Sequence, residues 1–359
     1  MRADPLAEGE NRFVAELKRL FGSSTPSAMV GIGDDAAVLP GKPVRVISVD
    51  LLVEKQHFRW DLMEPADVAV RALEVNLSDI AAMGARPEAV FLGLAWPSSG
   101  TALARLANFL RSFRAACKRR GVPLLGGDTV HADDGATTLA VTVVGTPWPG
   151  GPVLRSTGRP GDWLCVTGSL GGASLGLAVV ESRVRVARSP AARRAAAIAI
   201  RRLRRPRALL DAARVLARGA SALIDLSDGL GLDAPRLAGA SACGFRIDLS
   251  AIPIDPAVCR LVPDPAEALR HAIHGGDDYQ LLAAVPSRRF AAVHASLRRR
   301  GITLHRIGRL TPQPDLYLLS DSDGHLRPWP ERGWDPFRPL DASRGVGVGR
   351  GAPKDRTRR

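Results

Sequence analysis

Aspartates stand at the ends of several apolar segments of this chain, where their side chains would project from the end of a strand or helix. The segments GIGDDAAVL, VRVISVD, VNLSDIAAMGA, LLGGDTVH and IDLSDGL supply Asp34 and Asp35, Asp50, Asp79, Asp128, Asp225 and Asp228. Converging carboxylates cannot all stay ionised unless a cation balances them. We therefore predict a fold that brings these segments to one cleft, with a site for a hard divalent cation.

Each aspartate also has a structural interpretation. The Gly-Asp-Asp loop could be an ordinary turn, and Ser-Asp-Gly at Asp228 suits a helix N-cap. Asp79 is the most informative acid, because it lies in an apolar helical stretch, residues 72–83, where an unpaired charge is costly. It could instead pair with Arg71 or Arg86. The number of such sites in one chain favours the cation site.

Alternating strand-like and helix-like segments predict a mixed α/β (α+β) fold in two parts. We expect strands at residues 44–50, 89–96, 122–125, 137–146, 162–167, 222–224 and 280–285, and helices at 11–21, 65–84, 101–120, from 229 and near 300. The breaker cluster TPWPGGP marks the expected boundary. It predicts an N-terminal domain at 1–148, a C-terminal α/β domain at 149–339 and a disordered basic tail at 340–359.

The net charge of +14 comes entirely from two segments. Residues 183–207 hold ten arginines and no acid, and residues 340–359 hold six basic residues and two acids. We interpret the first segment as the solvated face of an Ala/Arg helix. The alternative is a basic nucleic-acid-binding protein, but aromatic residues that could stack on bases are missing from both segments.

Two further features predict a cytoplasmic protein. The sequence holds no apolar run near the length of a membrane span. Its four cysteines are far apart, with no C-x-x-C pair, which suits reduced core residues better than disulfides or zinc ligands. They are Cys117, Cys165, Cys243 and Cys259.

Several magnesium-binding aspartates are typical of enzymes that transfer a phosphoryl group from ATP. The chain has no Walker A sequence and no protein-kinase motif set. A nucleotide would therefore be held through metal ions and glycine-rich backbone. Gly126 and Gly127, just before Asp128, are candidates for that close approach to phosphate.

Taken in order, these motifs resemble the thiamine-monophosphate kinase family, within the aminoimidazole ribonucleotide synthetase-like superfamily of ATP enzymes. The resemblance rests on GIGDDAAVL, SVDLLVEKQHF, VNLSDIAAMGA, LLGGDTV, LRSTGRPGDWLCVTG, IDLSDGL and HGGDDYQLL, and spans about residues 13–337. It implies phosphorylation of thiamine phosphate to thiamine diphosphate by ATP, with several Mg²⁺ ions. It also implies a homodimer paired through the N-terminal sheets, and a C-terminal α/β domain.

The resemblance assigns roles residue by residue. The implied magnesium ligands are Asp35, Ser48, Val49 (through its carbonyl), Asp50, Asp79, Asp128, Asp225 and, for a further ion, Asp228. Positions that contact ATP are Gly127, Asp128, Arg155 and Ser227, and substrate positions are His57, Asp277 and Trp334. Asp50, Asp79, Asp128 and Arg155 are expected to be catalytic. The attacking phosphate oxygen is already anionic, so direct transfer needs no general base.

The chain departs from the family pattern at four positions. Val49, Leu51, Arg120 and Asp277 stand where the family commonly has threonine, threonine, an aromatic residue and glutamate. His57 could also be a core histidine, and Trp334 could simply pack. Among relatives, selenophosphate synthetases and hydrogenase-maturation proteins would carry terminal cysteines that this chain lacks. Phosphoribosylformylglycinamidine cyclase is the nearest alternative activity.

Overall fold

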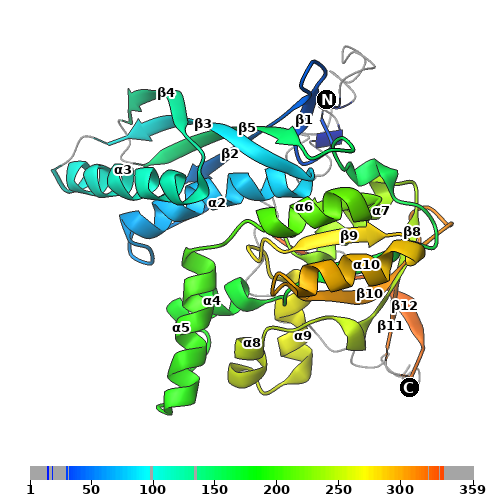
Figure 1. Cartoon of the computed structure of the whole chain (residues 1–359). Coiled ribbons are helices and arrows are strands. Elements are labelled where there is room, and N and C mark those ends of the chain that lie inside the picture. Colours follow the sequence, from blue (N-terminus) through cyan, green and yellow to red (C-terminus); the bar gives the residue numbers. More distant parts are fainter. Residues whose placement is uncertain are drawn as a thin grey trace, which may run out of the picture.

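The N-terminal part of the chain forms a five-stranded sheet in the order β1-β2-β5-β3-β4. In the computed structural model, residues 14–15, 18, 30, 32–97, 100–132, 136–321, 323–330 and 332–334 are described. The strands are β1 (Ala37–Leu39), β2 (Arg45–Val53), β3 (Ala85–Trp96), β4 (Leu124–His131) and β5 (Thr138–Pro147). Neighbours are antiparallel except β3 and β4. Helices α2 (Pro65–Ala82) and α3 (Gly100–Arg120) cover one face, and no described helix covers the other (Figure 1).

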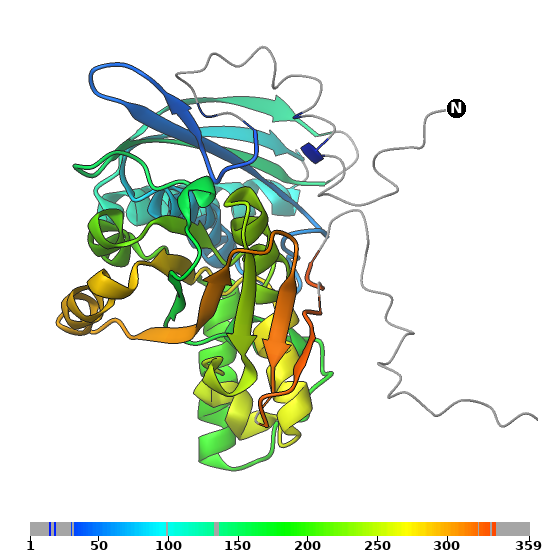
Figure 2. The ribbon, with the colours of Figure 1, turned by 90° about the vertical axis from the view of Figure 1, so that its right-hand side faces the viewer.

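The C-terminal part forms a seven-stranded sheet in the order β12-β11-β8-β10-β6-β9-β7. Its strands are β6 (Trp163–Thr167), β7 (Ala222–Asp225), β8 (Gly244–Asp248), β9 (Leu281–Val285), β10 (Leu304–Thr311), β11 (Tyr317–Ser320) and β12 (Leu326–Pro328). Only β8 and β11 pair in parallel. Figure 2 shows this sheet below the N-terminal one.

Helices cover both faces of the C-terminal sheet. The helical elements are η2 (Arg155–Thr157), α4 (Gly172–Val180), α5 (Pro190–Arg204), α6 (Leu210–Gly219), α7 (Leu230–Ala240), η3 (Leu249–Ala251), α8 (Pro256–Leu261), α9 (Pro265–His274) and α10 (Ser287–Arg298). Successive side chains of a strand point to opposite faces. Leu164 and Val166 of β6 accordingly pack with α7 and α9, whereas Cys165 packs with α6 and α10. The apolar run WLCVT therefore suits a strand buried on both sides.

Helix α2 joins the two halves. Pro65 and Asp67 favour its first turn, through the fixed φ of proline and the helix dipole. Most of its apolar side chains pack under the N-terminal sheet, but Ala81 and Ala82 pack with α6. The helix ends before Gly84, which has a left-handed φ of 58°. A Cβ at Gly84 would lie 2.9 Å from a Val153 methyl, so glycine also permits the close packing of the two halves.

The arginine-rich segment contains the predicted solvated helix. Ser189 caps α5 by accepting a hydrogen bond from the Ala192 backbone N–H, at 3.2 Å. The buried side of α5 consists of Ala192, Ala195, Ala196, Ala199 and Leu203. Arg193, Arg194 and Arg201 are exposed, so small residues pack while arginines face solvent.

The mixed α/β fold and most of the expected elements are confirmed. One strand is placed differently: β4 starts at Leu124 and runs to His131, so Gly126, Gly127 and Asp128 lie within a strand that was expected to span residues 122–125. The predicted basic tail and nearly all of the helix at 11–21 fall outside the described residues. The first sheet ends at Pro147 and the second begins at Trp163, while the exact domain limits stay a prediction.

The four cysteines are all free. Cys117, Cys165 and Cys243 are buried, as expected of core residues, but Cys259 is exposed, so the core prediction is wrong for that residue. Within the described residues, no helix combines the length and apolar character needed to cross a membrane.

Candidate active site

Three of the predicted aspartates meet where the two halves of the chain join. Asp35 precedes β1, Asp79 lies near the end of α2, and Asp225 is the last residue of β7. One carboxylate oxygen from each lies within 4.8 Å of the others. Asp35 and Asp225 are buried and Asp79 is partly buried. The cluster therefore depends on the packing of α2 between the two sheets.

Adjacent residues of the Asn-Leu-Ser-Asp motif hold this arrangement. Ser78 donates a hydrogen bond from Oγ to Asp225 Oδ2 at 2.6 Å. Asp79 accepts a short hydrogen bond at Oδ2 from Ser48 Oγ in β2. The motif thus connects α2 to a strand of each sheet. Sequence reasoning missed Ser78, although its position beside Asp79 was a usable signal.

The electrostatics of the cluster favour a bound cation. Burial, together with the charges of Asp50, Asp225 and Asp35, raises the pKa of Asp79 well above its ordinary value. Burial and the charge of Asp35 likewise raise the pKa of Asp225. Asp35 Oδ1 is buried and has no hydrogen-bond partner among the described residues. Buried carboxylate oxygens of this kind are ligands that Mg²⁺ prefers.

Arg155 completes one side of the cluster. Its Nε donates to Asp35 Oδ2 at 2.7 Å, and its backbone N–H donates to Asp34 Oδ2 at 3.1 Å. The Asp35 N–H donates in turn to Asp34 Oδ1 at 3.0 Å. Burial, and next the charge of Asp35, raises the pKa of Asp34 to about 6. The two adjacent aspartates therefore differ in role: Asp34 organises the backbone, whereas Asp35 faces the acidic cluster.

Successive side chains of β2 point to opposite faces of the sheet, so the predicted metal ligands in this strand do not all lie on the same face. Ser48 and Asp50 lie on the side of α2, where the Asp50 N–H donates to Asn76 Oδ1 at 3.1 Å. Val49 points to the opposite face and is 60% exposed. Only the main chain of Val49 could therefore reach a metal ion on the α2 side.

The single chain does not bring Asp128 or Gly127 to the cluster. In β4, Gly127 pairs with Leu92 and Asp128 with Gly93, so the Asp128 side chain projects from the face opposite Asp50. The Thr129 N–H donates to Asp128 Oδ1 at 2.8 Å. A Cβ at Gly127 would lie 1.9 Å from the Leu92 carbonyl oxygen, which explains this glycine by strand packing.

Asp228 also lies outside the three-carboxylate cluster. Its Oδ2 is paired with Arg236, and its backbone N–H donates to Asp233 Oδ2 at 3.1 Å. The neighbouring Ser227 contributes its carbonyl oxygen, which accepts from the Asp277 N–H at 2.7 Å. Metal binding by Asp228 and ATP contact by Ser227 stay predictions.

The three predicted substrate residues do come together. The rings of His57 and Trp334 lie edge to face, with centroids 5.5 Å apart. Burial, and next the charge of Arg71, lowers the pKa of His57, while Asp277 acts in the opposite direction. Trp334 donates its backbone N–H to the Asp228 carbonyl at 3.1 Å, which brings the C-terminal segment to this group.

Neither arginine considered as a partner of Asp79 fills that role. Arg71 forms an ion pair with Asp277 at 2.6 Å, and Arg86 lies 3.6 Å from Glu88. Arg71, which the sequence offered only as an alternative partner of Asp79, thus contacts the predicted substrate residue Asp277. Its partner is 206 positions away in sequence, so local spacing carried no signal for the pair.

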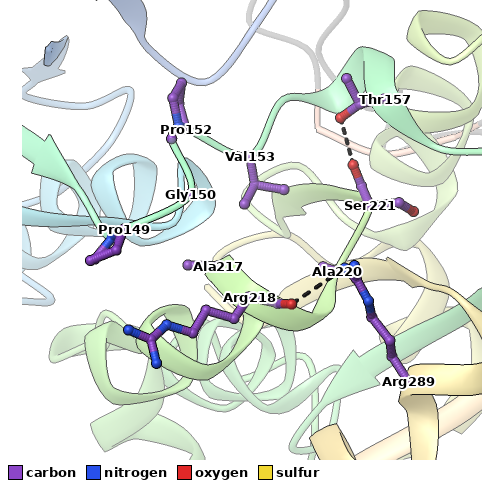
Figure 3. Close-up of a pocket in the computed structure, with 11 residues that line it drawn as sticks. Pro149, Gly150, Pro152, Val153, Thr157, Ala217, Arg218, Ala220, Ser221 and Arg289 are labelled. Atoms are coloured by element: carbon purple, nitrogen blue, oxygen red, sulfur yellow. Dashed lines mark hydrogen bonds between the residues drawn. The ribbon is translucent and has the colours of Figure 1, made fainter.

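A separate pocket of about 620 Å³ lies beside the segment that follows β5 (Figure 3). It is lined by residues 149–153, by Thr157, by residues 217, 218, 220 and 221 at and after the end of α6, and by Arg289. None of the converging aspartates lines it. Arg289 donates to the Arg218 carbonyl at 3.3 Å, so one of its charged lining groups is already engaged with the protein. The pocket is therefore separate from the carboxylate cluster.

Comparisons with known proteins match both halves of the chain to one family. Residues 33–146 match the AIR synthase related protein, N-terminal domain, and residues 159–320 match its C-terminal domain. Thiamine-monophosphate kinase of Escherichia coli strain K12 is 36% identical, over 92% of this chain and 99% of the relative. The Bacillus subtilis strain 168 protein of the same name is 30% identical, over 87% and 94%.

Solved structures extend the likeness to three dimensions. AaThiL complexed with AMPPCP and TMP is 26% identical with a TM-score of 0.79, covering 93% of this chain and 98% of that one. Thiamine-monophosphate kinase from Stenotrophomonas maltophilia K279a is 29% identical with a TM-score of 0.69, covering 87% and 96%. In sequence and fold, the chain belongs to the thiamine-monophosphate kinase family.

Proposed function

We propose that this protein transfers the γ-phosphoryl group of ATP to the phosphate of thiamine phosphate, forming thiamine diphosphate. One observation carries the proposal: Asp35, Asp79 and Asp225 converge from both halves of the chain, and an oxygen of Asp35 is buried without a partner. The AaThiL complex contains AMPPCP, an analogue of ATP, together with TMP. Intact, converging acids argue against a nucleic-acid-binding protein on a degenerate scaffold.

The cluster fits magnesium through its donor chemistry. Asp35, Asp79 and Asp225 would hold the ion, with Ser48 and Asp50 at the edge of the site. Bound Mg²⁺ would neutralise the charge of the transferring phosphates and fix their geometry. Ligation by Asp128 and Asp228 would require a change in their present contacts or a contribution from a second copy.

The protein's own part is to position and stabilise charge. Arg155 holds Asp35 through Nε, and no described residue accepts a hydrogen bond from its two terminal nitrogens. These nitrogens can donate to phosphate oxygens as a fork. The attacking oxygen of thiamine phosphate is anionic, so the site needs no general base. His57, Asp277 and Trp334 would bind the organic part of the substrate.

We further propose that a second copy of this chain covers the open face of the N-terminal sheet. Val49 and Leu51 of β2, Phe91 of β3 and Val130 of β4 are exposed apolar residues of this sheet. The β-sheet register places their side chains on the face away from α2 and α3. Asp128 lies on the same face. Pairing there would bury an apolar surface that a monomer leaves in water.

The compartment proposed for this activity is the cytoplasm, where ATP is supplied and thiols stay reduced. The free cysteines, three of which are buried, support it.

A product assay tests the proposed activity. The purified protein is incubated with ATP, Mg²⁺ and either thiamine phosphate or formylglycinamidine ribonucleotide, and products are identified by mass. We expect thiamine diphosphate from the first substrate, no product from the second, and no reaction in excess EDTA. Formation of only the purine product, or of neither product, would overturn the proposal.

A further inference from the structure

Asp277 is held through one of its two carboxylate oxygens. Oδ1 accepts hydrogen bonds from Arg71 Nη2 at 2.6 Å and from the Tyr279 hydroxyl at 3.1 Å. No hydrogen bond from a described residue reaches Oδ2. The Asp277 side chain is 31% exposed, whereas that of Arg71 is 5% exposed. One oxygen is therefore anchored in the protein, and the other is left for a molecule in the site.

The two anchoring residues are themselves fixed. Arg71 donates from Nη1 to the Leu203 carbonyl at 3.0 Å, which holds the guanidinium between α2 and the end of α5. Tyr279 is buried, and its backbone N–H donates to the Leu226 carbonyl at 2.9 Å. Burial, and next the charge of Asp277, raises the pKa of Tyr279 well above its ordinary value, so the hydroxyl keeps the proton that it donates.

The backbone supports the same geometry. Asp277 and Tyr279 both have positive φ, 68° and 47°, a conformation that side-chain-bearing residues adopt rarely. Such local strain occurs where surrounding structure fixes a functional group. Here the Asp277 N–H also donates to the Ser227 carbonyl at 2.7 Å. The orientation of the carboxylate is therefore set from both its backbone and its side chain.

His57 supplies the complementary group. Its Nδ1 accepts from the Val53 N–H at 3.0 Å, so the proton of the neutral ring is on Nε2. No described residue accepts a hydrogen bond from Nε2. The three predicted substrate residues thus present one hydrogen-bond acceptor, Asp277 Oδ2, and one donor, His57 Nε2–H, near the ring of Trp334.

We propose that Arg71 and Tyr279 are positioning residues that turn Asp277 so that its Oδ2 accepts the exocyclic amino group of the substrate's aminopyrimidine ring. The inference rests on the proposed function and names how that substrate is recognised. An aminopyrimidine edge carries an amino donor next to a ring-nitrogen acceptor. This pattern complements the acceptor of Asp277 and the donor of His57.

The inference predicts strong selection against a 4-oxo substrate. Replacing the amino group with a carbonyl turns a donor into an acceptor that faces the Asp277 carboxylate. Sites built to hydrogen-bond a substrate group can reject an analogue without it by about 10⁴-fold. The preference for the amino substrate should weaken when Asp277 loses its hydrogen bond to Arg71 or Tyr279, because the carboxylate can then rotate.

The test compares kcat/KM for thiamine phosphate and oxythiamine phosphate, its 4-oxo analogue. We expect the wild-type protein to prefer the amino substrate by at least about 100-fold. Tyr279→Phe should reduce that preference about tenfold, mainly by raising KM for thiamine phosphate. The matched control, Tyr317→Phe, alters the other tyrosine of the chain, in β11, and should leave the preference unchanged.

A length-exchange variant tests the ion pair separately. Arg71→Lys and Asp277→Glu should each lower kcat/KM, because the two groups no longer meet at the present distance. In the double variant, the added methylene of glutamate offsets the shorter reach of lysine, and kcat/KM should recover about tenfold of the loss. A general effect on folding would not produce such recovery. If Arg71→Lys fails to fold, Tyr279→Phe still decides the test.

The outcomes separate this inference from the proposed function. A wild-type protein that makes no thiamine diphosphate contradicts the function itself. A wild-type protein that makes it, combined with a folded Tyr279→Phe variant whose preference between amino and oxo substrates is unchanged, overturns only the positioning role.

Discussion

Arg155 Nε lies 2.7 Å from Asp35 Oδ2 and connects the segment between the two sheets to the loop before β1. The arginine is partly exposed and the aspartate is fully buried. The ion pair therefore holds the carboxylate of Asp35, a proposed metal ligand, in place and leaves part of the guanidinium exposed. The position of the Asp35 carboxylate therefore depends on how the two halves of the chain pack together.

Replacing Arg155 with lysine should reduce turnover while the fold persists. Lysine keeps the charge but cannot hold Asp35 and donate a fork to phosphate at once. We expect kcat to fall by about 10²-fold to 10³-fold. Steady-state kinetics with saturating ATP check the result, and Arg159→Lys, an exposed arginine nearby, serves as control. Unchanged kcat in Arg155→Lys would remove Arg155 from the catalytic group.

Neutralising a cluster acid should stabilise the metal-free protein and abolish activity. Asp79→Asn or Asp225→Asn relieves repulsion among buried carboxylates and should raise the free energy of unfolding in EDTA. Tm should then rise by about 2–4 °C for each kcal/mol of added free energy of unfolding. Turnover should fall by at least about 10³-fold, because a metal ligand is lost. Calorimetry and the product assay measure the two effects. The exposed Asp211→Asn should change neither, and a cluster variant with wild-type turnover would contradict the metal site.

Stability should depend on pH through Asp278. It accepts the Gly171 and Ala173 backbone N–H groups at 2.5 and 3.3 Å, and burial raises its pKa to about 7. Because the unfolded pKa is about 3.9, stabilisation by the bound proton is complete below pH 4 and is lost as pH rises through 7. We expect a loss on the order of 2 kcal/mol from pH 5 to 8.

Urea unfolding in saturating Mg²⁺ measures this effect, because bound cation suppresses the titration of the carboxylate cluster. Asp278→Asn cannot ionise and should reduce the change in the free energy of unfolding between pH 5 and 8. An equal slope in the wild-type protein and the variant would show that another group titrates.

The Arg120–Glu74 ion pair should be a large local contribution to stability. Arg120 Nε donates to Glu74 Oε1 at 2.7 Å, and the Ala208 N–H donates to Glu74 Oε2 at 2.8 Å. Arg120→Ala leaves Glu74, 9% exposed, without its cation, at a cost of about 3 kcal/mol. Denaturant unfolding checks this value. Arg120→Met with Glu74→Leu should recover most of the loss, and a single variant as stable as the wild type would contradict the role.

The proposed dimer can be tested through the open face of the N-terminal sheet. Leu51 is 57% exposed, and Leu51→Asp places a charge where a second copy is expected. Light scattering should show a dimer for the wild type and a monomer for the variant. Leu326→Asp, at an exposed leucine in β12, should stay dimeric. A monomeric wild-type protein would contradict the dimer.

Sequence reasoning predicted the acids that converge but could not place every ligand. Asp35, Asp79 and Asp225 stand at element ends, and the fold brings them together as expected. Asp128 fits the same pattern, yet strand alternation turns it to the opposite face from Asp50. The predicted strand ended at residue 125, before these glycines, because isolated sequence does not show that β3 lies beside them.

Long-range partners were the other part that sequence could not supply. Arg71 and Asp277 meet only after α2 packs against the C-terminal half. Nothing in the spacing of either residue distinguishes this pair from Arg71 with Asp79. The family resemblance predicts His57, Asp277 and Trp334 as substrate residues. Only the structure shows that Arg71 and Tyr279 hold Asp277.

Anomalous diffraction from crystals grown with Mn²⁺ and a non-hydrolysable ATP analogue would test the central claim most directly. The account predicts a manganese peak within ligand distance, about 2.2 Å, of carboxylate oxygens of Asp35, Asp79 and Asp225, with nucleotide phosphate oxygens on the same ion. A nucleotide bound with its metal elsewhere, and no peak at these three carboxylates, would contradict it.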